Sequence, residues 1–143
     1  MARVKDPKMV AQGKRNRAAG ARFERKTRKD LEEKGWTVVR WSNQMSLENE
    51  TIVPAKALFG MSTTGFPDFI AFKSQYSGDS GSIGHYEVIG VECKSNGYLK
   101  QEEKLKCQLY LDKNIFTKLY IARKGKKRGE IVYEDFTLKK FLK

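Results

Sequence analysis

Two apolar stretches decide the fold of this 143-residue chain: GFPDFIAF at residues 65–72 and VIGVECKS at residues 88–95. Both are rich in the aromatic and branched side chains typical of strands, yet both carry charge. Side chains alternate between the faces of a strand, so Glu92 and Lys94 share one face while Val91 and Cys93 share the other. Charges on a core strand cost several kcal/mol unless they are paired or bound to a metal. We therefore interpret these strands as parts of a functional site.

Hydrophobic spacing and turn residues indicate that helices and strands alternate along the rest of the chain. The sequence predicts a helix over 18–34, where Phe23, Thr27 and Leu31 recur at helical spacing, and a long loop over 42–65 with a helical turn near 55–59. The remaining predicted elements are strands at 36–41, 68–73, 86–95, 119–122 and 131–133, a helix at 99–112, and a terminal helix or turn at 136–142. This order predicts an α/β protein.

The charge of the chain indicates a polyanionic partner. Lys and Arg outnumber Asp and Glu by 29 to 17, a formal net charge of +12. Such a surface attracts nucleic acid. No apolar run approaches the ~20 residues that span a bilayer, and the first residues lack the apolar core of a signal peptide. Cys93 and Cys107 are interpreted as free thiols in a reducing cytoplasm, the host cytoplasm if the source is viral.

Residues 1–17 are predicted to form a basic, flexible arm, followed by a single domain over 18–143. The arm is strongly cationic and shows no apolar period. We expect it to be disordered alone and to order on a phosphate backbone, although a merely solubilising tail is the alternative. Its candidate DNA contacts are Lys14, Arg15 and Arg17.

One of four Glu-x-Lys sequences stands in an unusual setting. Three copies, at residues 24–26, 32–34 and 102–104, lie in charged, helical surroundings where a solvated face explains them. Only Glu92–Lys94 interrupts an apolar strand, and Pro67-Asp68 lies upstream of it. The combination Pro-Asp…Glu-x-Lys resembles the PD-(D/E)XK nuclease superfamily.

Phosphodiester hydrolysis explains why these residue types would be needed together. A hard cation polarises the phosphate and generates hydroxide, and Mg²⁺ (or Mn²⁺ in its place) prefers a few carboxylate oxygens plus water. Asp68 and Glu92 can supply two oxygens, and the backbone carbonyl of Cys93 a third. Lys94 can contact the attacking water or the charge that develops on the phosphate. Glu24, at the edge of the first predicted helix, is the candidate third acid.

A narrower resemblance covers roughly residues 18–125. Gly20-Ala21-Arg22-Phe23-Glu24-Arg25, followed by Val38-Val39-Arg40, is similar to the G-x-x-F-E-R helix and V-V-R strand of archaeal-type Holliday junction resolvases. The resemblance implies a restriction-endonuclease-like core, with a mixed sheet of about five strands flanked by helices, and a homodimer that cuts four-way DNA junctions. It also implies metal ligation by Glu24, Asp68 and Glu92, catalysis by Lys94, phosphate contacts from Arg25 and Arg40, with Arg22 beside them, and substrate positioning by Ser42.

Weaker signals and alternatives remain open. Gln101 resembles a glutamine that follows Glu-x-Lys in related nucleases, and chance explains it as well. The basic turn with Lys126 and Lys127 is a candidate phosphate contact or a solvated hairpin. The rival functions are a restriction- or repair-type nuclease acting on duplex, flap or single-stranded DNA, and a non-catalytic nucleic-acid-binding protein, because fold and catalytic residues do not settle the substrate.

Overall fold

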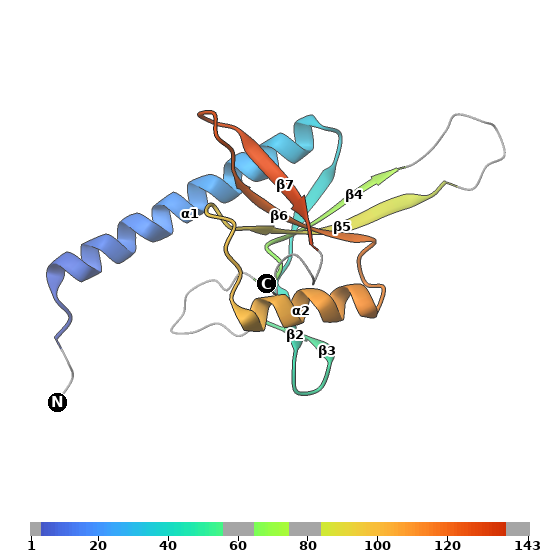
Figure 1. Ribbon diagram of the computed structural model, residues 1–143, viewed down its shortest axis with the longest axis horizontal. Coiled ribbons are helices and arrows are strands. Elements are labelled where there is room, and N and C mark those ends of the chain that lie inside the picture. The colour runs from blue at the N-terminus through green and yellow to red at the C-terminus, as the bar shows by residue number, and fades with distance from the viewer. Residues whose placement is uncertain (1–3, 56–64, 75–83, 137–143) are drawn as a thin grey trace.

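The protein is built around one five-stranded sheet with a helix on each face (Figure 1). The computed structural model describes residues 4–55, 65–74 and 84–136. Its elements are α1 (Pro7–Glu33), β1 (Thr37–Arg40), β2 (Asn43–Ser46), β3 (Thr51–Pro54), β4 (Phe69–Ser74), β5 (Tyr86–Cys93), α2 (Gln101–Asp112), β6 (Lys118–Lys124) and β7 (Ile131–Asp135). The predicted α/β class with a mixed five-stranded sheet is confirmed.

The sheet has the strand order β1-β4-β5-β6-β7. Every neighbouring pair is antiparallel except β5 and β6, which run parallel. The parallel pair is joined by α2, as a crossover between parallel strands requires. This arrangement brings the start of β4 and the ends of β1, β5 and β6 to one edge of the sheet, which we call the site edge.

Two apolar layers hold the helices against the sheet. On one face, Phe23 and Leu31 of α1 pack with Ile89 and Val91 of β5. On the other face, Cys107 and Tyr110 of α2 belong to a cluster that also contains strand residues of β6. Successive side chains of β5 point alternately into the two layers, so this central strand is buried on both sides.

Helix α1 begins at Pro7, eleven residues before the predicted helix start at 18, so residues 7–17 are helical where a flexible arm was expected. The Asp6 carboxylate accepts a hydrogen bond from the Lys8 N–H at 2.9 Å and caps the helix. The buried residues of α1, Phe23, Thr27 and Leu31, all lie in its second half. The first half extends beyond the sheet (Figure 1). None of the described residues in this half is buried, so packing requires no apolar period there, while its Ala, Lys, Arg and Gln residues favour a helix.

The predicted long loop over 42–65 contains a hairpin instead. Strands β2 and β3 pair antiparallel, with Met45 opposite Ile52, and the Met45 side chain is fully buried. The Asn-Gln-Met-Ser sequence of β2 lacks branched side chains, so propensity did not mark it as a strand. The helical turn predicted near 55–59 and the terminal helix predicted at 136–142 lie almost entirely outside the described residues.

Neither helix in the described part of the chain is both long enough and apolar enough to span a membrane.

Candidate active site

The site edge gathers the residues that the sequence singled out. Arg40, the last residue of β1, pairs with Phe69, and the N–H of Trp41 donates to the Asp68 carbonyl at 3.0 Å. Asp68 therefore lies directly before β4, which begins at Phe69, one residue later than the predicted strand start at Asp68. Because β4 and β5 are antiparallel, with Phe69 opposite Val91, Asp68 meets Glu92.

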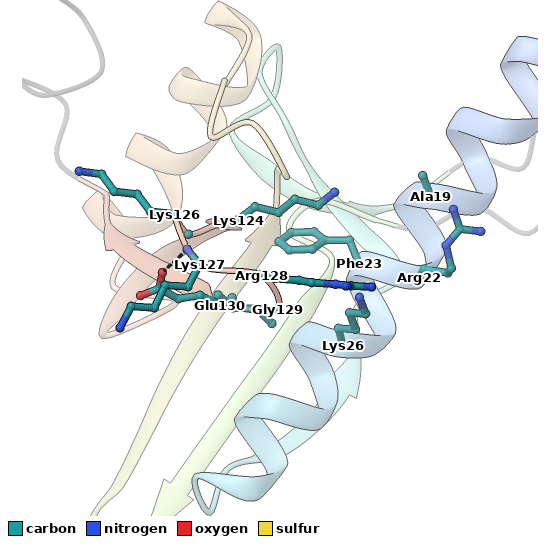
Figure 2. A pocket seen from close by; sticks show the side chains of 12 residues that line it. Ala19, Arg22, Phe23, Lys26, Lys124, Lys126, Lys127, Arg128, Gly129 and Glu130 are labelled. Atoms are coloured by element: carbon teal, nitrogen blue, oxygen red, sulfur yellow. Dashed lines mark hydrogen bonds between the residues drawn. The ribbon is translucent and has the colours of Figure 1, made fainter.

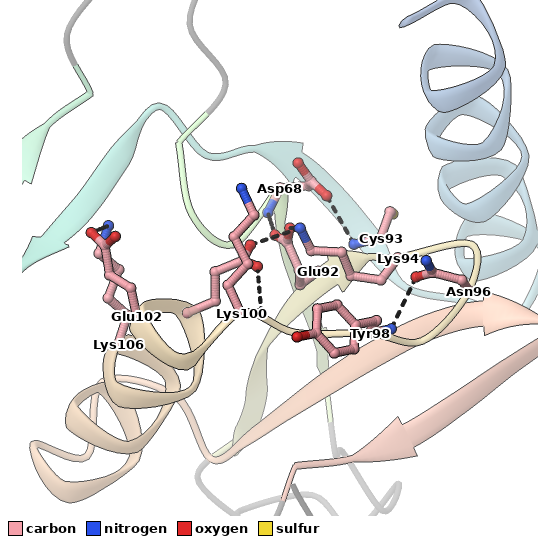
Figure 3. Close-up of polar contacts among 10 residues, drawn as sticks. Asp68, Glu92, Cys93, Lys94, Asn96, Tyr98, Lys100, Glu102 and Lys106 are labelled. Atoms are coloured by element: carbon pink, nitrogen blue, oxygen red, sulfur yellow. Dashed lines mark hydrogen bonds and ion pairs between the residues drawn. The ribbon is translucent and has the colours of Figure 1, made fainter. Parts of the chain in front are cut away.

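Asp68 and Glu92 each accept a hydrogen bond from backbone at or next to the other residue (Figure 3). The Asp68 N–H donates to Oε2 of Glu92 at 3.0 Å. In return, Oδ2 of Asp68 accepts a hydrogen bond from the Cys93 N–H at 2.8 Å. Only 7% of Asp68 and 5% of Glu92 is exposed. The backbone thus fixes both carboxylates in place, and we call them the acidic pair.

The surroundings of the acidic pair disfavour two negative charges. Burial raises the pKa of Asp68 to about 6, outweighing the Cys93 N–H, and the nearby charge of Glu24 adds to the rise. Burial and then the Asp68 charge raise the pKa of Glu92 well above its ordinary value. A bound cation would relieve this repulsion, so the pair is electrostatically suited to hold one.

Lys94 reaches the acidic pair from just beyond β5. Its Nζ lies 3.7 Å from Oε1 of Glu92 and 2.7 Å from Oε2 of Glu103. The side chain is 26% exposed, which leaves it accessible to a ligand. Burial disfavours the charged ammonium, but the bonds to Glu103 and Glu92 outweigh it and raise the pKa of Lys94. Lys94 is therefore held as a cation.

Glu103 is a site residue that the sequence reasoning missed. It lies in the first turn of α2, where its Oε1 accepts a hydrogen bond from the Lys100 N–H at 2.9 Å. Its other oxygen binds Lys94, so one carboxylate both caps α2 and orients the lysine. The only sequence signal for Glu103 is the Glu102-Glu103 pair, and the charged surroundings of residues 102–104 predict a solvated helix face there. Glu102 does lie exposed, but Glu103 is half-buried.

The segment before Asp68 is anchored on several sides. The Gly65 N–H donates to the Trp41 carbonyl and the Phe66 N–H to the Asn43 carbonyl, both at 2.9 Å. The Tyr110 hydroxyl of α2 donates to the Phe66 carbonyl. A side chain at position 65 would place its Cβ 2.0 Å from the Asn43 carbonyl oxygen, so this position requires glycine. Hairpin β2–β3, which the sequence did not predict, therefore helps to position Asp68.

The other residues predicted for the site lie on α1, on β1 and just after β1. Glu24 is half-buried on α1, at the opposite face of the sheet from Glu103, and it acts on Asp68 through its charge. Within the described residues, no three Asp, Glu, His or Cys side chains form a group that could hold a metal, so Glu24 is not gathered with the acidic pair as a compact ligand set. Ser42 is exposed just after β1. Arg40 and Arg25 are exposed on β1 and α1.

The remaining predicted contacts are surface residues. Gln101 is the exposed first residue of α2. Lys126 and Lys127 are exposed in the turn between β6 and β7. The cations predicted on the arm and on the first helix, Lys14, Arg15, Arg17 and Arg22, are exposed on the first two-thirds of α1.

The donor chemistry of the acidic pair fits a hard divalent cation. Mg²⁺ is commonly held by one or two carboxylates together with water and substrate phosphate. Each carboxylate of the pair uses one oxygen for a backbone N–H. The other oxygens, Oδ1 of Asp68 and Oε1 of Glu92, are the donors that a cation would use, with the Cys93 carbonyl as the predicted third.

Comparisons with protein-family models, with curated proteins and with solved structures found no match to this chain. The functional assignment therefore depends on the geometry of the site edge and on the resemblance of its motifs.

Proposed function

We propose that this protein is a Mg²⁺-dependent endonuclease that hydrolyses DNA phosphodiester bonds, with the four-way junction as its substrate. The observation that carries the proposal is the acidic pair, two carboxylates interlocked by backbone hydrogen bonds, with the cationic Lys94 3.7 Å from one of them. A structural ion-pair network is the alternative explanation. It does not account for why Asp68 and Glu92 share an environment that raises the pKa of both.

In the proposed mechanism, Asp68 and Glu92 would hold the cation and Lys94 would act on the substrate. Bound Mg²⁺ would polarise the phosphate and lower the pKa of a water molecule. The Lys94 ammonium donates hydrogen bonds to the phosphate oxygens, on which negative charge develops as the phosphodiester bond is attacked. Glu103 keeps the ammonium charged and directed toward the acidic pair, so that little reorganisation is needed during the reaction.

The choice of DNA as substrate is supported by charge. The net charge of +12 favours a polyanion, and exposed cations surround the site edge on β1, α1 and the β6–β7 turn. The choice of a junction is supported by the resemblance of residues 20–25 and 38–40 to resolvase motifs. A homodimer, which would present two sites to opposite strands, is part of the same proposal.

The test is cleavage of a synthetic four-way junction beside a linear duplex that contains the same sequences, with Mg²⁺ or Mn²⁺. We expect paired cuts in the junction and much slower cutting of the duplex. Asp68→Asn and Glu92→Gln keep the shape of each side chain and should reduce cutting by at least about a thousandfold, since they remove the cation's ligands.

The outcomes separate the rival functions. Equal cutting of junction and duplex would reject the resolvase and retain a nuclease of restriction or repair type. Cutting by both variants at the wild-type rate would reject the acidic pair as the active site. DNA binding without cutting under any divalent cation would identify a non-catalytic binding protein.

A further inference from the structure

A basic pocket lies between α1 and the turn that joins β6 to β7 (Figure 2). Its volume is about 470 Å³. Its wall on the α1 side includes Arg22, Phe23 and Lys26. The opposite wall is the chain from Lys124 to Ile131. We call this cavity the hairpin pocket.

The charges around the hairpin pocket are almost all positive. Six cationic residues line it, against Glu130 as the one acid in its lining: Arg22, Lys26, Lys124, Lys126, Lys127 and Arg128. Oε2 of Glu130 is already engaged by the Lys127 N–H at 3.1 Å. So many like charges facing one cavity repel one another unless an anion lies between them.

Within the hairpin, the side chains that reach toward α1 are not those the sequence favoured. Figure 2 shows Lys124 and Arg128 extending from the hairpin toward α1, on either side of the Phe23 ring. Lys126 and Lys127 extend away from the helix at the tip of the turn. Phe23 is only 5% exposed, so its ring closes the pocket and offers little face on which a base could stack. The chemistry of the pocket therefore suits phosphate.

The hairpin pocket lies next to the acidic pair along the site edge. The Lys94 N–H donates to the Ala122 carbonyl at 2.9 Å, and the Lys124 N–H donates to the Ser95 carbonyl at 3.1 Å. These bonds continue the parallel pairing of β5 and β6 beyond Cys93. On the other wall, Phe23 is followed directly by Glu24, whose charge acts on Asp68. The pocket and the acidic pair therefore share the site edge, and a DNA strand that lies along this edge can contact both.

The exposed half of α1 extends the same basic surface. A period of 3.6 residues places Lys8, Arg15 and Arg22 on the side of the helix that carries Lys26. They recur every seven residues, about 10 Å apart along the axis. This stripe leads from the hairpin pocket away from the sheet. DNA binding along the stripe would explain why the first half of α1 extends beyond the sheet, which packing does not explain.

We propose that the hairpin pocket binds the phosphodiester backbone of a DNA strand beside the cleavage site, and that the α1 stripe follows the same strand outward. This inference deepens the proposed nuclease function, but the binding it predicts requires no catalysis. The recognised group is the phosphate, so the contact positions DNA without reading its sequence.

The experiment measures binding of a fluorescein-labelled DNA duplex in the presence of a chelator, where no metal-dependent cleavage occurs. The pocket variant is Lys124→Gln/Arg128→Gln. The matched control is Lys113→Gln/Lys118→Gln, which removes the same charge from exposed residues at the end of α2 and the start of β6, opposite the site edge. A third variant, Lys126→Gln/Lys127→Gln, removes the same charge from the tip of the hairpin.

We expect the pocket variant to bind about tenfold more weakly at ~0.15 M salt, and its salt dependence to decrease by about two counterions. The control should lose no more than about threefold, and the tip variant should fall between them. Unaltered circular dichroism would show that all three fold. Equal losses in the pocket variant and the control, or a greater loss in the tip variant, would overturn the proposal.

The failure of this inference and of the proposed function are distinguishable. If the wild-type protein cuts no DNA with any cation but the pocket variant alone binds weakly, the pocket stands and the nuclease is rejected. If the wild type cuts junctions while the pocket variant and the control bind alike, the nuclease stands and the pocket is rejected.

Discussion

The acidic pair and the hairpin pocket are neighbours on one edge of the sheet, yet they are built in opposite ways. Asp68 and Glu92 are more than nine-tenths buried and are held by two backbone hydrogen bonds from β4 and β5. The pocket cations, such as Lys124 and Arg128, are exposed at the ends of flexible side chains. The difference separates two requirements: chemistry needs fixed groups in a site of low dielectric, whereas backbone binding needs only a positive field.

Outside the acidic pair itself, the largest expected effect concerns Lys94, which lies between the two regions. Lys94→Gln should reduce the single-turnover rate of DNA cleavage about 10²- to 10³-fold, because it removes a charged donor from the developing charge on the phosphate. Lys113→Gln, at the end of α2 that is remote from Lys94, removes the same charge and serves as the control. If both variants cleave at similar rates, then Lys94 contributes only to the general field, and the contrast between the two regions disappears.

A smaller effect should appear in the stability of the metal-free protein. The pKa of Asp68 is about 6 in the folded state, against an ordinary value of 3.8, so the folded protein binds the proton more tightly. The stabilisation from the protonated group is complete below about pH 4 and is lost as the pH rises through 6. Two pKa units correspond to about 3 kcal/mol of unfolding free energy.

Asp68→Asn removes this dependence and supplies the measurement. The difference in unfolding free energy between variant and wild type, from urea denaturation in a chelator, should shift by up to about 3 kcal/mol in favour of the variant between pH 4 and pH 7. Mg²⁺ should restore part of the wild type's loss. If the unfolding free energies of the two proteins change with pH in parallel across this range, then the pKa of Asp68 is not raised by folding.

The smallest effect concerns the first half of α1. Removing residues 1–17 should shift the melting temperature by less than about 2 °C, because none of the described residues in this segment is buried. The same truncation should weaken DNA binding about tenfold and lower its salt dependence, since it removes Lys8 and Arg15 from the stripe. A large loss of stability with unchanged binding would show that this half of the helix is structural.

The sequence predicted those parts of the fold that have their own local pattern. Strands β4 and β5 alternate as expected, and their odd charges led directly to Asp68, Glu92 and Lys94. The helix over residues 7–17 was not predicted, because a helix that buries no face has no apolar period to detect. Strand β2 was missed because its burial depends on Met45 alone among polar neighbours.

The residues that complete the site were harder to predict. Glu103 resembles any acid on a charged helix until the crossover connection of α2 brings its first turn to Lys94. Lys26 is far in sequence from Lys124 and Arg128, and only the packing of α1 beside the β6–β7 turn makes them neighbours. Glu24, the predicted third acid, lies on α1 at the opposite face of the sheet from Glu103, and its charge raises the pKa of Asp68, so its role as a ligand stays a prediction.

The sequence by itself determined which residues are costly to bury, and thus predicted a functional site at positions 68, 92 and 94. Chain alternation and desolvation energies are local properties, so they can be inferred without coordinates. Only the tertiary structure decided which groups surround them. The strand order and the two faces of the sheet set distances between residues remote in sequence, and electrostatic interactions depend on those distances.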